Sequence, residues 1–208
     1  SIINPEKLVE TINRHNPSLM QATPSLFKLL KSVNWQGKKE MKIFCGGESF
    51  PKELAEWLKV RCDSVWNMYG PTETTIWSLT HEFEDVINDV PIGRPIANTQ
   101  IFILDQYLKP IPIGVIGDLY IGGNGLATSY YKDPEQTDTK FINWQCDGHS
   151  SRIYKTGDRA KYDTLGNVYF MGRKDFQVKL NGHRIELEEI EAVLNQIDFI
   201  KQTVVLVD

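Results

Sequence analysis

The sequence predicts an α/β fold: a partly parallel sheet covered by helices, then a small distorted β-barrel, then a short α+β segment. Three observations carry this prediction. Helical and strand signals alternate from Pro5 to Tyr69, as they do where helices cover a parallel sheet. Short β-rich runs broken by Gly, Pro and Asp follow from Asp85 to Gly172, which is typical of an antiparallel sheet or barrel. A polar turn at residues 172–175 then separates off the last segment.

The first region begins with a helix over residues 5–15. Asn-Pro opens it, and Leu8 and Ile12 lie on one face at helical spacing. Further elements then alternate as strand, helix, strand, helix and strand over residues 18–22, 24–30, 41–45, 51–60 and 64–66. This alternation predicts strands that run parallel, because each helix returns the chain to the same edge of the sheet.

The middle and last regions carry weaker signals. Strands are expected over residues 99–104, 118–121 and 167–171, and a hairpin (176–185), a helix (187–196) and a strand (203–207) should follow. So few residues after the polar turn cannot form an independent core. We therefore expect residues 1–174 to be one domain and residues 175–208 to be the incomplete beginning of a second.

Composition limits the functional classes. The 208 residues are 41% hydrophobic with a net charge of −4, which is ordinary for a globular protein. No Lys/Arg run suggests nucleic-acid binding, no apolar stretch approaches the roughly 20 residues of a membrane span, and no secretion signal is visible. Three widely spaced cysteines argue against a disulfide framework or zinc site, so we expect a cytoplasmic protein.

The turn Asn67-Met68-Tyr69-Gly70-Pro71-Thr72-Glu73 is the first candidate for chemistry. It offers an aromatic face, a hydroxyl and a carboxylate just after a buried strand. These groups are suited to stacking on a purine, contacting a phosphate and holding Mg²⁺. The alternative is that Tyr69 simply packs in the core, and the turn alone leaves both interpretations open.

Two familiar phosphate motifs are excluded. Gly37-Lys38-Lys39 lacks the Ser/Thr and the upstream glycine of a Walker A loop. The glycine loop at residues 122–125 has Thr128 where a dinucleotide fingerprint needs its third glycine. Four scattered histidines support no Ser-His-Asp arrangement.

The remaining glycine-punctuated loops occur in a fixed order. After the turn at residues 67–73 come Tyr154-Lys155-Thr156-Gly157-Asp158 and the Gln-Val-Lys-x-x-Gly-x-Arg-Ile-Glu-Leu run at residues 177–187. Together they resemble the adenylate-forming superfamily, in particular adenylation domains of nonribosomal peptide synthetases, over essentially the whole chain. The resemblance implies the C-terminal half of an adenylate-forming core, followed by the start of its small C-terminal subdomain.

The resemblance also implies a reaction and a set of binding residues. An amino acid carboxylate attacks the α-phosphate of ATP, and the aminoacyl-AMP passes to the pantetheine thiol of a carrier protein. Tyr69 would stack on adenine beside a loop of Gly46, Gly47 and Glu48. Thr72 would contact the α-phosphate and Glu73 would hold Mg²⁺. Asp158 would contact the ribose hydroxyls, and Arg173 would lie near the ribose and phosphates. Asp175 would be the hinge between the subdomains, and Gly182 would lie in the loop that approaches the pantetheine tunnel.

The amino acid pocket is implied in the same way. Its lining would comprise Gln21, Ile43, Cys45, Met68, Ile76 and Trp77, a set similar to pockets that select glycine. Large side chains leave little room for a substrate side chain, so we expect glycine first and alanine second. The alternative is that Trp77 packs in the core and the pocket runs elsewhere.

Some features depart from the family pattern. Ala127-Thr128-Ser129-Tyr130 stands where Ala-Arg-Gly-Tyr is usual, and Arg159 stands where leucine is common. The family's phosphate loop, amine-binding aspartate and late lysine are not among these residues. We therefore expect a fragment with little activity by itself, and a methyltransferase inserted after Asp208 would be compatible.

Partners are implied too. They are an amino acid, a carrier protein, neighbouring synthetase domains of secondary-metabolite biosynthesis and a small MbtH-like activator. The alternatives are an acyl- or aryl-acid ligase of the same superfamily, and a non-catalytic nucleotide-binding or docking remnant.

Overall fold

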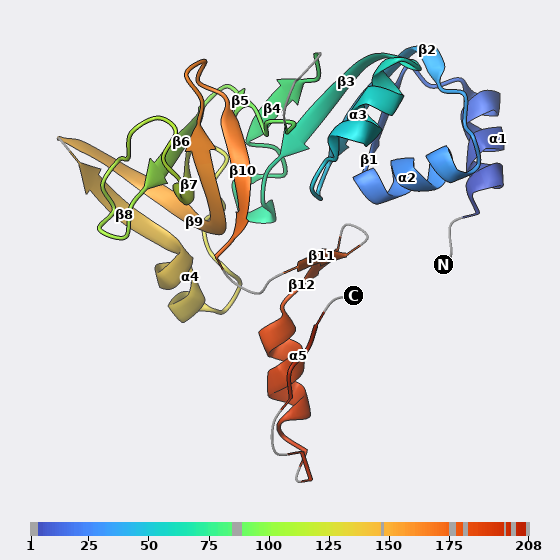
Figure 1. Cartoon of the computed structure of the whole chain (residues 1–208). Helices are drawn as coiled ribbons and strands as arrows, with labels where there is room; N and C mark the ends of the chain where they lie inside the picture. Colours follow the sequence, from blue (N-terminus) through green and yellow to red (C-terminus); the bar gives the residue numbers. More distant parts are fainter. Residues whose placement is uncertain are drawn as a thin grey trace.

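The computed structural model describes residues 4–84, 89–146, 148–174, 178–180, 183–197, 199–200 and 203–206. Its first part alternates helices and strands, as Figure 1 shows in blue to teal. The order is α1 (Pro5–His15), β1 (Leu19–Ala22), α2 (Pro24–Ser32), β2 (Lys38–Gly46), α3 (Lys52–Lys59) and β3 (Cys62–Tyr69). The predicted alternation is therefore confirmed, and α1 has the predicted bounds.

The first sheet is parallel only in part. β1, β2 and β3 are neighbours and run parallel, and β4 (Leu79–Glu82) and β5 (Arg94–Pro95) then extend the sheet antiparallel to β3. The parallel strands bring the ends of β2 and β3 to one edge, because Gly46 lies opposite Met68 in the register. Loops that follow these two strands are therefore adjacent.

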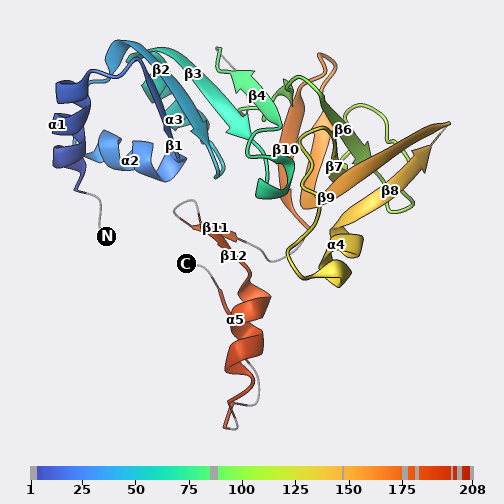
Figure 2. The same cartoon turned by 180° about the vertical axis from the view of Figure 1, so that it is seen from behind.

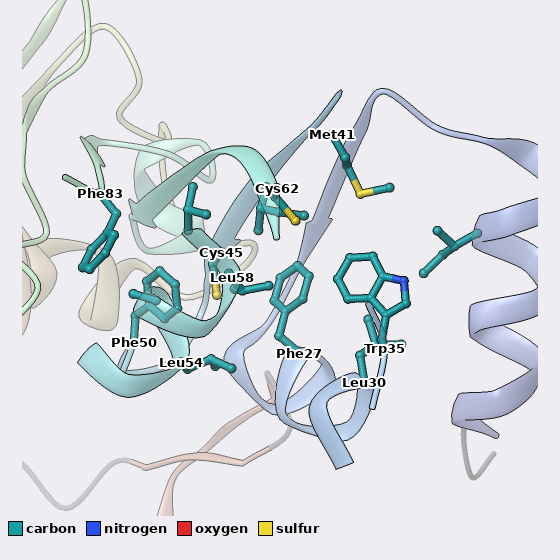
Figure 3. Packing of buried hydrophobic residues seen from close by; sticks show 14 residues of the cluster. Phe27, Leu30, Trp35, Met41, Cys45, Phe50, Leu54, Leu58, Cys62 and Phe83 are labelled. Atoms are coloured by element: carbon teal, nitrogen blue, oxygen red, sulfur yellow. The ribbon is translucent and has the colours of Figure 1, made fainter. Parts of the chain in front are cut away.

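The helices cover one face of this sheet. Figure 3 shows Phe27 and Leu30 of α2, and Leu54 and Leu58 of α3, packed around Cys45 of β2. Local signals fix where the helices begin: the Asn4 side chain accepts a hydrogen bond from Lys7 N, and Thr23 caps α2, with proline in the first turn of each helix. Such caps satisfy backbone donors that the helix itself leaves unbonded.

The second sheet is antiparallel. Its strands are β6 (Thr99–Leu104), β7 (Gly117–Gly123), β8 (Phe141–Cys146), β9 (His149–Tyr162) and β10 (Val168–Arg173), in the order β10-β9-β7-β6 with β8 paired to β9. The short helix α4 (Pro134–Lys140) precedes β8. Figure 2 shows these strands beside the end of the first sheet. Backbone bonds between Gly93 and Val168 link the two parts, and the predicted barrel-like region is confirmed.

The last segment contains a hairpin of β11 (Val178–Leu180) and β12 (His183–Ile185), followed by α5 (Leu187–Leu194). Both elements confirm the prediction, and α5 extends away from the two sheets in Figure 1. The predicted strand over 203–207 is wrong for the described residues 203–206, which form no strand. A strand needs a partner ladder, whereas Val205 N donates instead to the Glu191 carboxylate at 2.8 Å.

The polar turn expected at residues 172–175 also differs in part. Gly172 and Arg173 are the last residues of β10, and the bend comes at Lys174. Arg173 is thereby fixed to the sheet opposite Asp158 of β9. Among the described residues, no helix is long and apolar enough to cross a membrane.

Candidate active site

A cavity of about 530 Å³ lies where the ends of the first sheet meet the second. Its wall includes the loop after β2, the end of β3, and side chains of β9 and β10. The lining residues that matter most are Gly47, Glu48, Met68, Tyr69, Asp158 and Arg173. Five of these six were predicted as nucleotide-binding residues, and Met68 was predicted for the amino acid pocket.

Two residues far apart in the sequence converge on the Asp158 carboxylate in this cavity. The Tyr69 hydroxyl donates to Asp158 Oδ2, and Arg173 Nη1 donates to Asp158 Oδ1 at 2.6 Å. The Asp158 and Arg173 side chains are only 7% and 13% exposed. Charge-assisted bonds of this kind are short and directional, so Asp158 joins β3, β9 and β10.

Burial and the neighbouring carboxylate together set the protonation state of Tyr69. Burial, and then the negative charge of Asp158, raise the pKa of the Tyr69 phenol well above its ordinary value. The phenol therefore stays neutral and remains a donor. The ionised Asp158 carboxylate lines the cavity, and such a carboxylate acts only as a hydrogen-bond acceptor.

A glycine at the centre of β9 positions this carboxylate. Gly157 has φ of +80°, a conformation that side chains disfavour. The kink lets the Thr156 hydroxyl accept a bond from Asp158 N at 3.0 Å and donate to Leu119 O at 2.7 Å. Lys174 N then bonds to Gly157 O at 2.9 Å, which fixes the strand end that carries Arg173.

Close packing explains glycine at the end of β2. A Cβ on Gly46 would lie 2.2 Å from Met68 O and 2.8 Å from Trp77 Cζ3, far inside van der Waals contact. The Trp77 ring and the Met68 backbone therefore lie directly against Gly46. The next glycine, Gly47, has φ of +88°, and it turns the chain so that Glu48 points toward α2.

The turn after β3 holds Thr72 and Glu73 in a 3-10 helix, η1 (Thr72–Thr74). Glu73 is buried, with 7% of its surface exposed. The Tyr130 hydroxyl donates to Glu73 Oε1 at 2.6 Å, and Ala127 N donates to Glu73 O at 2.8 Å. The loop that departs from the family pattern therefore packs directly behind this carboxylate.

Tyr130 is a candidate that the sequence reasoning missed. Burial, followed by its bonds to Glu73 and Tyr154, raises the pKa of the Tyr130 phenol well above its ordinary value, so it is a neutral donor. Its signal in the sequence is its position at the end of residues 127–130, directly after Thr128 and Ser129, which differ from the family pattern.

The described residues contain no group of three or more His, Cys, Asp or Glu that could hold a metal ion. Glu73 would supply one carboxylate as an oxygen ligand. Mg²⁺ in nucleotide sites commonly takes one or two carboxylates and completes its shell with phosphate oxygens and water. The donor chemistry of Glu73 therefore fits Mg²⁺ that arrives with a nucleotide.

The six residues predicted for the amino acid pocket fall into three environments. Met68 and Trp77 lie against Gly46. Ile43 and Cys45 are fully buried in the cluster beneath the helices, and burial raises the pKa of the Cys45 thiol above its ordinary range. Gln21 and Ile76 are exposed. Asp175 and Gly182 lie outside the described residues.

Comparison with known proteins places this arrangement in a family. A sequence profile described as AMP-binding enzyme matches residues 2–131. The chain belongs to the AMP-binding enzyme family. Within this family it corresponds to part of a nonribosomal peptide synthetase adenylation domain.

The relatives support that assignment. The chain is 41% identical over 208 residues to a dimodular nonribosomal peptide synthase of Bacillus subtilis, covering 100% of this chain and 9% of the relative. It is 34% identical over 207 residues to tyrocidine synthase 3 of Brevibacillus parabrevis, covering 97% of this chain and 3% of the relative. The chain thus spans less than a tenth of the length of either relative.

Solved structures agree on the fold. One is a holo four-domain nonribosomal peptide synthetase bound to AMP and glycine, with 43% identity, a TM-score of 0.80 and coverage of 99% of this chain and 16% of that chain. Another contains adenylation and PCP domains bound to a vinylsulfonamide inhibitor, with 30% identity, a TM-score of 0.91 and coverage of 100% of this chain and 37% of that chain. The predicted fold class is confirmed.

Proposed function

We propose that this chain supplies the nucleoside side of an adenylation site that converts ATP and an amino acid, with glycine favoured, into aminoacyl-AMP and pyrophosphate. The acyl group would then pass to the pantetheine thiol of a carrier protein. One observation carries the proposal: Tyr69, Asp158 and Arg173 converge in a cavity of about 530 Å³. A cavity of this size suits a nucleotide.

Each residue of the network has a role that its geometry supports. Asp158 lines the cavity, and its carboxylate oxygens are acceptors of the kind that ribose hydroxyls need. The Tyr69 ring would flank adenine opposite the loop of Gly46 and Gly47, where glycine lets the backbone approach the base. The Arg173 guanidinium would place positive charge near ribose and phosphate.

Thr72 and Glu73 would serve the phosphate end. Thr72 stands at the start of η1, where its hydroxyl would contact the α-phosphate. Glu73 would hold Mg²⁺, and a bound Mg²⁺ would neutralise charge on the phosphates. This chain's own contribution is to bind and orient, because phosphoryl-type transfer depends mostly on positioning and electrostatics.

Glycine is the proposed amino acid. Trp77 and Met68 lie against Gly46 and would fill the space that a larger substrate side chain needs. The neighbouring structure that is 43% identical is bound to AMP and glycine, which supports the same choice. The lining roles of Gln21, Ile43, Cys45 and Ile76, the hinge at Asp175 and the tunnel residue Gly182 remain part of this proposal.

The proposed partners are a carrier protein, neighbouring synthetase domains and an MbtH-like activator, in a cytoplasmic setting. The neighbour that contains adenylation and PCP domains supports the carrier protein. We further propose that the 208 residues alone have little adenylation activity.

Binding of a nonhydrolysable adenylate tests the proposal without requiring turnover. The 208-residue chain is titrated with 5′-O-(N-glycylsulfamoyl)adenosine by calorimetry, and the benzoyl and leucyl analogues are compared. We expect the glycyl compound to bind best. Tighter binding of the benzoyl analogue would favour an aryl-acid ligase, and tighter binding of the leucyl analogue would overturn the glycine assignment. Failure of all three to bind would contradict the proposed site.

A further inference from the structure

Glu48 lines the nucleotide cavity, but its carboxylate engages the protein. Oε2 accepts hydrogen bonds from Ser25 Oγ at 2.6 Å and from Ser25 N at 3.1 Å. The other oxygen, Oε1, is buried and has no hydrogen-bond partner among the described residues. The carboxylate therefore faces helix α2, where its partner Ser25 is 23 residues away in the sequence.

The partner group lies where a carboxylate is most favourable. Ser25 is the second residue of α2 (Pro24–Ser32), and the first backbone N–H groups of a helix have no partner within the helix. Thr23 caps Leu26 N, and Glu48 serves Ser25 N. The positive end of the helix dipole also favours a negative charge at this point.

The bond restrains a segment that has little stiffness of its own. Gly46 and Gly47 precede Glu48, and glycine has more backbone freedom than any other residue. Gly46 packs on Met68 and Trp77, whereas a Cβ on Gly47 would have one neighbour within 4 Å, Thr23 Cγ2 at 3.6 Å. After Gly46, the contact of Glu48 with Ser25 is therefore an attachment that restrains this wall of the cavity, ahead of Phe50, which is buried in the core.

We propose that Glu48 is a positioning residue: its bond to Ser25 holds the Gly46–Gly47 wall in place for the nucleoside, and its carboxylate does not contact the ligand. The bond also directs the negative charge toward the helix, away from the phosphates of a bound nucleotide. This inference rests on the proposed function, since the wall matters only if the cavity binds an adenylate.

The test compares ligand affinity in four variants of the 208-residue chain. The probe is 5′-O-(N-glycylsulfamoyl)adenosine, and the variants are Ser25→Ala, Glu48→Ala, Glu48→Gln and the double variant Ser25→Ala/Glu48→Ala. We expect Glu48→Ala, which removes both bonds to Ser25, to weaken binding roughly 10-fold or more, as loss of hydrogen bonds to a charged group allows. Ser25→Ala removes only the Oγ bond and should weaken binding by a smaller factor. The double variant should be no weaker than Glu48→Ala, because Glu48→Ala already removes both bonds to Ser25, including the one that Ser25→Ala removes.

Two controls separate positioning from general damage. Ser32→Ala lies at the other end of α2, where its hydroxyl bonds locally to Leu29 O, and it should leave affinity unchanged. Glu48→Gln keeps an acceptor for Ser25 and should retain most of the ligand affinity. This variant keeps the test decisive if Glu48→Ala does not fold.

The outcomes distinguish this inference from the function on which it rests. Additive losses from Ser25 and Glu48 would show that Glu48 contacts the ligand directly and would overturn the inference. A lower melting temperature of Glu48→Ala with unchanged ligand affinity would also overturn the inference. Absence of binding by the unmodified chain would instead overturn the proposed function, and the inference with it.

Discussion

Replacing Asp158 by Asn removes the charge that joins three strands while preserving the size of the side chain. Tyr69 and Arg173 both donate to this buried carboxylate. Hydrogen bonds to charged groups contribute about 1.5–3 kcal/mol each, and Asn keeps one acceptor oxygen. We therefore expect the free energy of unfolding to fall by about 2 kcal/mol. A chain of this length should then melt roughly 4–8 °C lower.

The assay is thermal unfolding followed by circular dichroism or calorimetry, with Asp63→Asn as the matched control. Asp63 is exposed on β3, and surface substitutions usually change stability by less than about 0.5 kcal/mol. Asp158→Asn should also weaken binding of the glycyl adenylate analogue roughly 10-fold or more, since the ribose hydroxyls lose a charged acceptor. If Asp158→Asn melts and binds like Asp63→Asn, the reasoning about this network is refuted.

Three further predictions concern other parts of the molecule. Tyr130→Phe removes the donor to Glu73 and should lower stability in urea by about 1–2 kcal/mol, whereas Tyr131→Phe, at an 86% exposed site, should not; equal effects would contradict this role. Burial alone would raise the pKa of Asp163, but hydrogen bonds within its own turn hold that pKa below 3.8. The ionised Asp163 therefore stabilises the folded state fully above pH 3.8, and this stabilisation is lost as the pH falls through the lower pKa of the folded state. In Asp163→Asn, the free energy of unfolding should accordingly depend less on pH below pH 4. Cys45 is fully buried and burial raises its thiol pKa, so iodoacetamide at pH 8 should label it only after unfolding, as mass spectrometry would report.

Local signals explain why the sequence predicts the alternating helices and strands from α1 to β3, although it did not predict β4 and β5. Asn4 and Pro5 start α1, and Asn16, with φ of +47°, ends it, so the bounds of this helix depend on neighbouring residues alone. The strand expected over residues 203–207 had no comparable local signal at its ends. Residues 203–206 carry a β-like composition, but pairing depends on a partner that composition does not reveal.

In the candidate site, too, some residues could be predicted from the sequence and others could not. The family resemblance pointed to Tyr69, Asp158 and Arg173, and the structure brings them together. The contacts of Glu48 with Ser25 and of Tyr130 with Glu73 join residues 23 and 57 positions apart. Such pairs are chosen by tertiary packing, and neither periodicity nor turn chemistry in a single sequence specifies them.

The strand faces show a related limit. Ile43 and Cys45 alternate along β2 and pack beneath the helices, so their position in a motif did not reveal how deeply they are buried. Gly46, one residue further on, lies against Met68 and Trp77. The sequence predicts that these residues come close to one another, and packing decides which of them face a cavity.

Titration of the ¹⁵N-labelled chain with AMP, followed by amide NMR spectra, tests the central claim most directly. An adenylate site in the cavity predicts saturable shifts that centre on Gly47, Tyr69 and Asp158 and that need roughly 10-fold more AMP, or still more, to saturate in Asp158→Asn. No shifts, or shifts that centre instead on the separate hollow beside Asn124 and Arg152, would contradict the claim.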